Sequence, residues 1–159
     1  KSGYFLLKPE AQTAIKDLTS ITDVVTPNIP EAEVLTELQI KNSSDMEKAA
    51  FKIKAIGAKN VLVKGGHRCN DANDVLLYEN KILNISGHRI DTKNTHGTGC
   101  TLSSAIASYL AKGESIDKAV YLAKRYITKA IENSFSIGSG VGPVGHFIEL
   151  YKKADMDFK

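Results

Sequence analysis

The sequence predicts an α/β fold in which helices are layered on a mostly parallel β-sheet. Short apolar or β-branched runs alternate along the chain with longer segments whose apolar residues recur at helical spacing. The composition, 42% hydrophobic and 25% charged residues, is ordinary for a globular domain. With 159 residues the chain can bury a sizeable core. We find no linker and no internal repeat, and therefore expect residues 1–159 to form one domain or part of one.

The first part of the chain predicts three helices and two strands. Proline is tolerated in the first turn of a helix, which favours helix starts near Pro9 and Pro30. Ser44 and Glu47 have the spacing of a capping box and predict the start of a third helix, which ends at Gly57. In chain order we expect a helix over Lys8–Leu18, a strand over Asp23–Thr26, a helix from Pro30, a helix from Ser44 to Gly57 and a strand over Asn60–Gly66.

The second part predicts a hairpin, one more short strand and three helices. The hairpin joins Leu76–Asn80 to Lys81–Ile85, and His88–Asp91 is the further strand candidate. Helices are expected after residue 97, over Ile116–Asn133 and over Gly145–Ala154, with a glycine-rich loop before the last one. Helical spacing predicts that the first of these helices buries Leu102, Ala105, Ile106, Tyr109 and Leu110.

Charge and cysteine content exclude several classes of protein. The net charge of +3 at pH 7 does not indicate nucleic-acid binding, which uses clustered basic residues. No apolar run is long enough to span a membrane, and no secretory signal opens the sequence. Two cysteines, Cys69 and Cys100, are typical of a reduced compartment, so we expect a cytoplasmic protein.

The stretch Gly97-Thr98-Gly99-Cys100 directly precedes an amphipathic helix. Glycines at such a turn allow unusual backbone angles and let a ligand approach the main chain. The first amide groups of a helix have no partner within the helix and lie at the positive end of its dipole. The turn therefore predicts an anion site, most naturally for phosphate.

Cys100 falls in or beside the first turn of that helix. A helix N-terminus favours the thiolate form of cysteine, which can take a proton from a hydroxyl group or attack as a nucleophile. From these residues alone, a second interpretation stands equally: the glycines serve only turn geometry, and Cys100 is a small buried apolar side chain.

Two further patterns predict contacts with a phosphate or a metal ion. Asn28 and Glu31 follow a predicted strand, at the edge where open α/β sheets bind ligands. A carboxylate there can hold Mg²⁺ directly or through water, although Glu31 also suits the first turn of a helix for electrostatic reasons alone. Lys64, at the end of a strand and before two glycines, is placed to meet a phosphate of ATP.

Other binding motifs fit less well. A P-loop needs Gly-Lys-Ser or Gly-Lys-Thr, which the chain lacks, and the dinucleotide fingerprint needs a glycine where Leu102 stands. His96 and Cys100 lie four residues apart, but no second pair at ligand spacing supports a zinc site.

The ordered set "TPNIPEAEVL", "VLVKGGH", "DTKNTHGTGCTLSSAIA" and "GSGVGPVGHF" resembles the hydroxymethylpyrimidine/phosphomethylpyrimidine kinases of thiamine biosynthesis, in the ribokinase superfamily. The resemblance runs nearly end to end and implies a three-layer α/β/α ribokinase-like fold. It implies ATP as co-substrate, Mg²⁺, and phosphorylation of 4-amino-5-hydroxymethyl-2-methylpyrimidine and then of its monophosphate.

The same resemblance assigns roles to individual residues. It implies that Cys100 is the catalytic base and that Gly97, Thr98 and Gly99 form the anion hole for the transferred phosphoryl group. It further implies that Asn28, Glu31, Lys64 and Thr95 contact the nucleotide, with Glu31 binding Mg²⁺ through water.

The resemblance covers only the C-terminal part of the family's fold, and Val141 stands where members often carry histidine. We therefore expect an incomplete acceptor pocket, an exposed sheet edge, and a homodimer or association with a preceding segment. We therefore expect kinase activity of the whole protein and not of this part alone.

Three alternatives stay open. One is a pyridoxine or pyridoxal kinase on the same scaffold. Another is a hydrolase or transferase with Cys100 as nucleophile and a histidine as base, although His96 precedes Cys100 too closely for such a pair and no third group to orient the base is evident. The third is a nucleotide-binding protein without catalysis.

Overall fold

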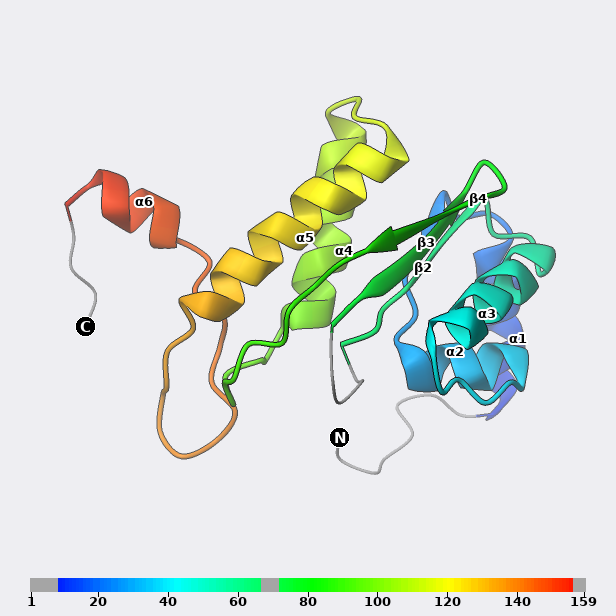
Figure 1. The fold of residues 1–159 in the computed structure, drawn as a ribbon, viewed down its shortest axis with the longest axis horizontal. Helices are drawn as coiled ribbons and strands as arrows, with labels where there is room; N and C mark the ends of the chain where they lie inside the picture. The colour runs from blue at the N-terminus through cyan, green and yellow to red at the C-terminus, as the bar shows by residue number, and fades with distance from the viewer. Residues whose placement is uncertain (1–8, 67–71, 156–159) are drawn as a thin grey trace. The chain divides into compact units, whose positions relative to one another are not determined.

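The computed structural model describes residues 9–66 and 72–155, with side chains from residue 14 onward. The chain forms two compact units, Lys1–Arg89 and Ile90–Lys159, which are described one at a time. Their elements are labelled in Figure 1. The expectation of one partial domain stays a prediction.

The described residues of the first unit form a mixed four-stranded sheet and three helices. Its helices are α1 (Pro9–Thr19), α2 (Ile29–Thr36) and α3 (Ser43–Ala55), and its strands are β1 (Val24–Val25), β2 (Asn60–Val63), β3 (Asp74–Tyr78) and β4 (Lys81–Ile85). The strand order is β1-β2-β3-β4. These bounds agree with the helices, the strands and the hairpin that the sequence predicts in this unit, to within a few residues.

Strand pairing differs from the expectation of a mostly parallel sheet. β1 pairs with β2 in parallel, whereas β2–β3 and β3–β4 are antiparallel. The last pair is a tight hairpin, in which Glu79 and Asn80 adopt positive φ angles of 45° and 61°. Two such residues match the twist of antiparallel strands. The α/β class is confirmed, but the four described strands form a mixed sheet.

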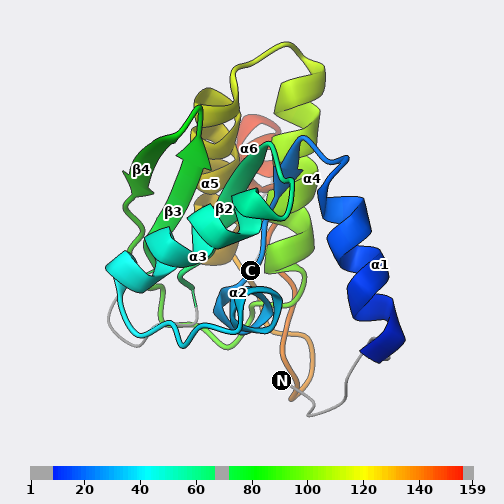
Figure 2. The ribbon, with the colours of Figure 1, turned by 90° about the vertical axis from the view of Figure 1, so that its right-hand side faces the viewer.

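The core of the first unit lies between α3 and one face of the sheet (Figure 2). Helical spacing buries Met46, Ala49, Ala50 and Ile53 on one side of α3. The alternation of a strand turns Val61 and Val63 of β2 and Val75 and Leu77 of β3 toward the same cluster. Leu62 and Leu76, between them in the sequence, are also fully buried, so β2 and β3 are covered on both faces.

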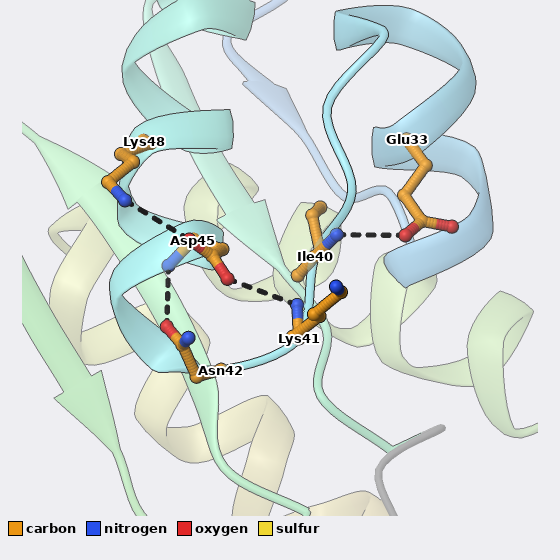
Figure 3. Close-up of polar contacts among 6 residues, drawn as sticks. All are labelled: Glu33, Ile40, Lys41, Asn42, Asp45 and Lys48. Atoms are coloured by element: carbon orange, nitrogen blue, oxygen red, sulfur yellow. Dashed lines mark hydrogen bonds and ion pairs between the residues drawn. The ribbon is translucent and has the colours of Figure 1, made fainter.

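The segment between α2 and α3 is held by side chains at its two ends (Figure 3). Glu33 Oε1 accepts a hydrogen bond from the amide of Ile40 (2.9 Å), and Asp45 Oδ2 accepts one from the amide of Lys41 (3.2 Å). The ammonium group of Lys48 lies 3.1 Å from Asp45 Oδ1 and, with the Lys41 amide, lowers the pKa of this carboxyl group. The entry into α3 is thereby tied to α2.

The predicted capping box of Ser44 and Glu47 is wrong. The N-cap of α3 is Asn42, whose side-chain oxygen accepts a hydrogen bond from the amide of Asp45 (3.0 Å). Asparagine caps helices as well as serine does, and here it comes two residues earlier, so Ser44 already lies inside the first turn.

The second unit is built on two helices that lie side by side with opposite chain directions (Figure 1). They are α4 (Thr98–Ala111) and α5 (Ile116–Glu132). Leu102 and Ile106 are the buried residues of α4, whereas Ala105, Tyr109 and Leu110 are half-buried. One side of α5 is buried through Ala119, Val120, Ala123, Ile127 and Ala130, whereas Ile116 and Ile131 at its two ends are half-buried.

The ends of the second unit depart from the prediction. His88–Asp91 forms no strand, because none of its residues enters a ladder of the described sheet. The last helix, α6 (Ile148–Lys153), begins three residues later than expected. Gly145 instead donates its amide to the carbonyl of Ala130 at the end of α5 (2.8 Å), which ties the preceding loop back to that helix. No helix in the described part of the chain is long and apolar enough to cross a bilayer.

Candidate functional site

The turn before α4 depends on glycine at position 97. Gly97 is the N-cap residue and has φ 84°, a left-handed conformation that residues with a side chain adopt rarely. The Thr98 hydroxyl donates to the carbonyl of Thr95 (2.9 Å), and the amide of Thr101 donates to the carbonyl of Gly97 (2.9 Å). These bonds hold Thr95, Gly97 and Thr98 in one tight turn.

The helix start leaves donors free to meet a ligand. No side chain caps α4, and the hydrogen bonds of the described residues engage neither the amide of Gly99 nor that of Cys100. The Cys100 side chain is exposed and free, so it is not the buried apolar residue of the second sequence interpretation. Two unengaged amides at a helix N-terminus, next to an exposed thiol, can hold an anion beside a group that accepts a proton.

A groove of about 460 Å³ begins at Cys100 and follows one side of α4. This volume lies within the range of small-molecule sites. It explains why Ala105 and Tyr109 are only half-buried: both line the groove instead of the core. The lining residues are Cys100, Thr101, Ser104, Ala105, Ser108, Tyr109, Lys112, Tyr126 and His146.

Nucleophilic catalysis by Cys100 with His96 as its base gains no support from the described contacts. The main-chain amide of His96 donates to the carbonyl of Gly142 (3.1 Å). This bond joins the segment before α4 to the loop that follows α5. Within the described residues, no hydrogen bond joins the His96 ring to Cys100.

Asn28 and Glu31 form a capping box at the start of α2. The Asn28 side-chain oxygen accepts from the amide of Glu31 (2.9 Å), and Glu31 Oε2 accepts from the amide of Asn28 (2.7 Å). The pattern that the sequence analysis connected with Mg²⁺ is thus also the helix cap. Glu31 is exposed, and one of its two carboxylate oxygens is engaged in this way.

Lys64 lies next to Asn28 at the end of the sheet. The two residues form an isolated parallel bridge, and the amide of Lys64 donates to the carbonyl of Pro27 (2.8 Å). Parallel strands end at the same edge, which brings the two patterns together. Directly after Lys64, the amide of Gly65 donates to the buried carboxylate of Asp74 (2.8 Å).

Each unit therefore assembles its own part of the predicted set. Asn28, Glu31 and Lys64 meet in the first unit, and Thr95 and Gly97–Cys100 form one turn in the second. Among the described residues, no group of three His, Cys, Asp or Glu side chains could hold a metal ion. Mg²⁺ keeps most of its water, so a carboxylate such as Glu31 together with substrate phosphates suits it. Cys69 lies outside the described residues.

Asn94, which lies buried just before the turn, was not among the site residues predicted from the sequence. Its side chain bonds to Ser136 and to Gly142. These partners are 42 and 48 residues away along the chain, so no local pattern could reveal the contact.

Comparison with known proteins identifies the family. The family model for phosphomethylpyrimidine kinase matches residues 1–145. This chain belongs to the phosphomethylpyrimidine kinase family. Hydroxymethylpyrimidine/phosphomethylpyrimidine kinases of Haemophilus influenzae and Bacillus subtilis are 42% and 41% identical to it, each over 92% of this chain. The chain spans 57% and 55% of the length of these two relatives.

Solved structures of this fold include two vitamin kinases. Pyridoxal kinase of Bacillus subtilis in its ADP complex has a TM-score of 0.85 and 39% identity, over 91% of this chain and 58% of that protein. Phosphomethylpyrimidine kinase of Clostridium difficile has a TM-score of 0.70 and 45% identity, over 82% of this chain and 53% of that protein. The ribokinase-like α/β fold class is thereby confirmed.

Proposed function

We propose that this chain supplies the phosphate-transfer part of an ATP-dependent kinase of thiamine biosynthesis. The kinase phosphorylates 4-amino-5-hydroxymethyl-2-methylpyrimidine and then the resulting monophosphate. Family membership supports this function, and a relative from Geobacter sulfurreducens, 45% identical, is a thiamine biosynthesis protein. The structural observation that carries the proposal is the exposed Cys100 beside unengaged amides at the start of α4.

The turn at Gly97–Cys100 has the features that phosphoryl transfer needs. Catalysis of this reaction is mainly positioning and stabilisation of charge. The hydroxyl oxygen of the pyrimidine attacks the γ-phosphorus while the bond to the bridging oxygen of ADP breaks. The hydroxyl proton passes to Sγ of Cys100, and the amides of Gly99 and Cys100 donate to the transferred group. These donors are already oriented by the helix, so the reaction requires no reorganisation of them.

Residues of the first unit have the chemistry to hold ATP and its metal ion. The ammonium group of Lys64 suits a phosphate oxygen, and the carboxylate of Glu31 suits a water of Mg²⁺, with Asn28 orienting that carboxylate. When bound, Mg²⁺ neutralises charge on the phosphates. Thr95, whose carbonyl holds Thr98, completes the nucleotide contacts that we propose.

The test is ADP release by the full-length protein with ATP, Mg²⁺ and the pyrimidine alcohol. We expect ADP release only with both substrates, and a loss of about 10²- to 10⁴-fold in kcat for Cys100→Ala. Cys69→Ala is the matched control and should keep its rate. Turnover without ATP, or equal rates for Cys100→Ala and the wild type, would exclude this function.

A second candidate is a pyridoxal kinase. It is favoured by the likeness to the Bacillus subtilis pyridoxal kinase and to the Staphylococcus aureus pyridoxal kinase, the latter with a TM-score of 0.85 in complex with AMP-PCP and pyridoxal. Turnover of pyridoxal in the same assay decides between the acceptors. Cytoplasmic location and association with a second copy or a preceding segment stay predictions.

A further inference from the structure

The Asn94 side chain connects the segment before the catalytic turn to a distant loop. Asn94 is only 6% exposed. Its Nδ2 donates to the hydroxyl of Ser136 (3.1 Å), and its Oδ1 accepts from the amide of Gly142 (3.0 Å). Both ends of the side-chain amide are thus bonded to one loop, residues 134–142.

Gly142 is bound from two sides by residues 94–96. Its amide donates to Asn94, and its carbonyl accepts from the amide of His96 (3.1 Å). The approach is close enough to require glycine, since a Cβ atom there would lie 2.3 Å from Asn94 Oδ1 and 2.5 Å from the carbonyl of Phe135. We call these contacts of Asn94 and His96 with Gly142 the Gly142 clamp.

The clamp acts on the backbone that leads directly into the anion turn. His96, whose amide belongs to the clamp, directly precedes Gly97, the N-cap residue of α4 with a positive φ. A second bond between the same segments, from Thr92 Oγ1 to Ser134 Oγ (3.2 Å), lies farther from the turn and does not involve Gly142.

We propose that Asn94 is a positioning residue for phosphoryl transfer, because it holds Gly142 against His96 and thereby orients the amides of Gly99 and Cys100. This inference rests on the proposed function. Asparagine suits this position because its Nδ2 donates to Ser136 while its Oδ1 accepts from Gly142. Aspartate keeps the acceptor alone, and alanine keeps neither.

The kinetic test compares Asn94→Ala, Asn94→Asp and the control Ser134→Ala in the full-length protein. We expect kcat of Asn94→Ala to fall about tenfold to a hundredfold, since small displacements of catalytic groups have effects of this size. The KM for ATP should stay within about threefold of wild type, because amides that act in the transition state affect kcat and leave ground-state binding unchanged. Asn94→Asp should recover part of the rate, and Ser134→Ala should match the wild type.

Hydrogen exchange provides a readout that does not depend on turnover. The amides of His96 and Gly142 should exchange faster in Asn94→Ala than in the wild type, while Ser134→Ala leaves them unchanged. Global unfolding would accelerate exchange in α5 as well, which separates it from loss of the clamp.

Different experimental results would overturn the proposed function and the positioning role of Asn94. A wild-type protein without ATP-dependent turnover would overturn the proposed function and the role of Asn94 with it. An active wild type with an equally active Asn94→Ala, or a Ser134→Ala variant as impaired as Asn94→Ala, would overturn the positioning role alone.

Discussion

Cys100 can act as a base only where the acceptor has a proton to give up. In the proposed function, the first acceptor is an alcohol, whose hydroxyl is protonated at neutral pH. The second acceptor is a phosphate monoester, with a second pKa of about 6, so its oxygen is already ionised at pH 7.5 to attack the γ-phosphorus. We therefore predict that Cys100→Ala impairs the first phosphorylation far more than the second, by about tenfold or more in the ratio of the two kcat values.

Separate assays that start from the alcohol and from its monophosphate measure this ratio. Cys69→Ala serves as the control for removal of a thiol. If Cys100→Ala lowers both rates by the same factor, the thiol acts by shaping the anion turn, and the role of base is wrong.

Glu31 combines a structural role with a proposed catalytic one, and two substitutions separate them. Glutamine keeps an oxygen that can accept from the amide of Asn28, so Glu31→Gln should retain the helix cap. It removes the negative charge, however, and should raise the Mg²⁺ concentration that gives half-maximal rate. Glu31→Ala loses both functions and should also lower the free energy of unfolding by about 1 kcal/mol.

Urea unfolding and a Mg²⁺ titration of the rate measure the two effects. If neither variant changes the Mg²⁺ requirement, Glu31 acts only in the helix cap and its proposed role toward Mg²⁺ is wrong.

At the residue scale, the predictable features were those encoded over a few neighbouring positions. The turn at Gly97–Cys100 and the pair Asn28 and Glu31 are contiguous patterns, and the structure places each of them at a helix start. Asn94 depends on a loop far along the chain and could not be found in this way. A local pattern likewise does not tell whether Glu31 serves the helix cap or a metal ion, because both roles favour the same residue types.

Among the helices, α3 shows most directly which residue defines a start. The Asn42 side chain bonds to the amide of Asp45, whereas Ser44 lies within the first turn. We predict that Asn42→Ala lowers the free energy of unfolding by about 1 kcal/mol and that Ser44→Ala changes it by less than about 0.5 kcal/mol. Chemical unfolding of the two variants under the same conditions measures the difference. An equal or larger loss for Ser44→Ala would contradict this assignment of the cap.

Element boundaries were predicted well where a turn or cap signal coincided with hydrophobic periodicity. The hairpin of β3 and β4 and the bounds of α5 follow from such coincidences. His88–Asp91 shows the limit of this reasoning: its residue types suit a strand, but a strand requires a hydrogen-bonding partner, and the described sheet provides none there. The antiparallel pairing of β2 with β3 could not be predicted either, because local sequence does not encode the relative direction of two strands.

For the molecule as a whole, the family match extends across both units, and the proposed function assigns residues of each to one reaction. Lys64, in the first unit, is assigned to the phosphates of ATP, and Cys100, in the second, to the attacking hydroxyl. Neither assignment involves the ring of the acceptor. In this proposal Lys64 acts on ATP, the donor in both reactions, and Cys100 acts on the hydroxyl group that a pyrimidine alcohol and pyridoxal both carry.

This shared chemistry leads to a prediction about acceptor choice. Lys64→Ala and Cys100→Ala should each lower kcat/KM for the pyrimidine alcohol and for pyridoxal by the same factor, so the ratio between the two acceptors should stay within about threefold of the wild-type ratio. The measurement is kcat/KM for both alcohols with the full-length wild type and the two variants. If either substitution shifts the ratio by about tenfold, which corresponds to about 1.4 kcal/mol, the altered side chain contacts the ring and contributes to specificity. Its assignment to phosphoryl transfer alone would then be wrong, and the preference between the two vitamins would depend in part on residues within this chain.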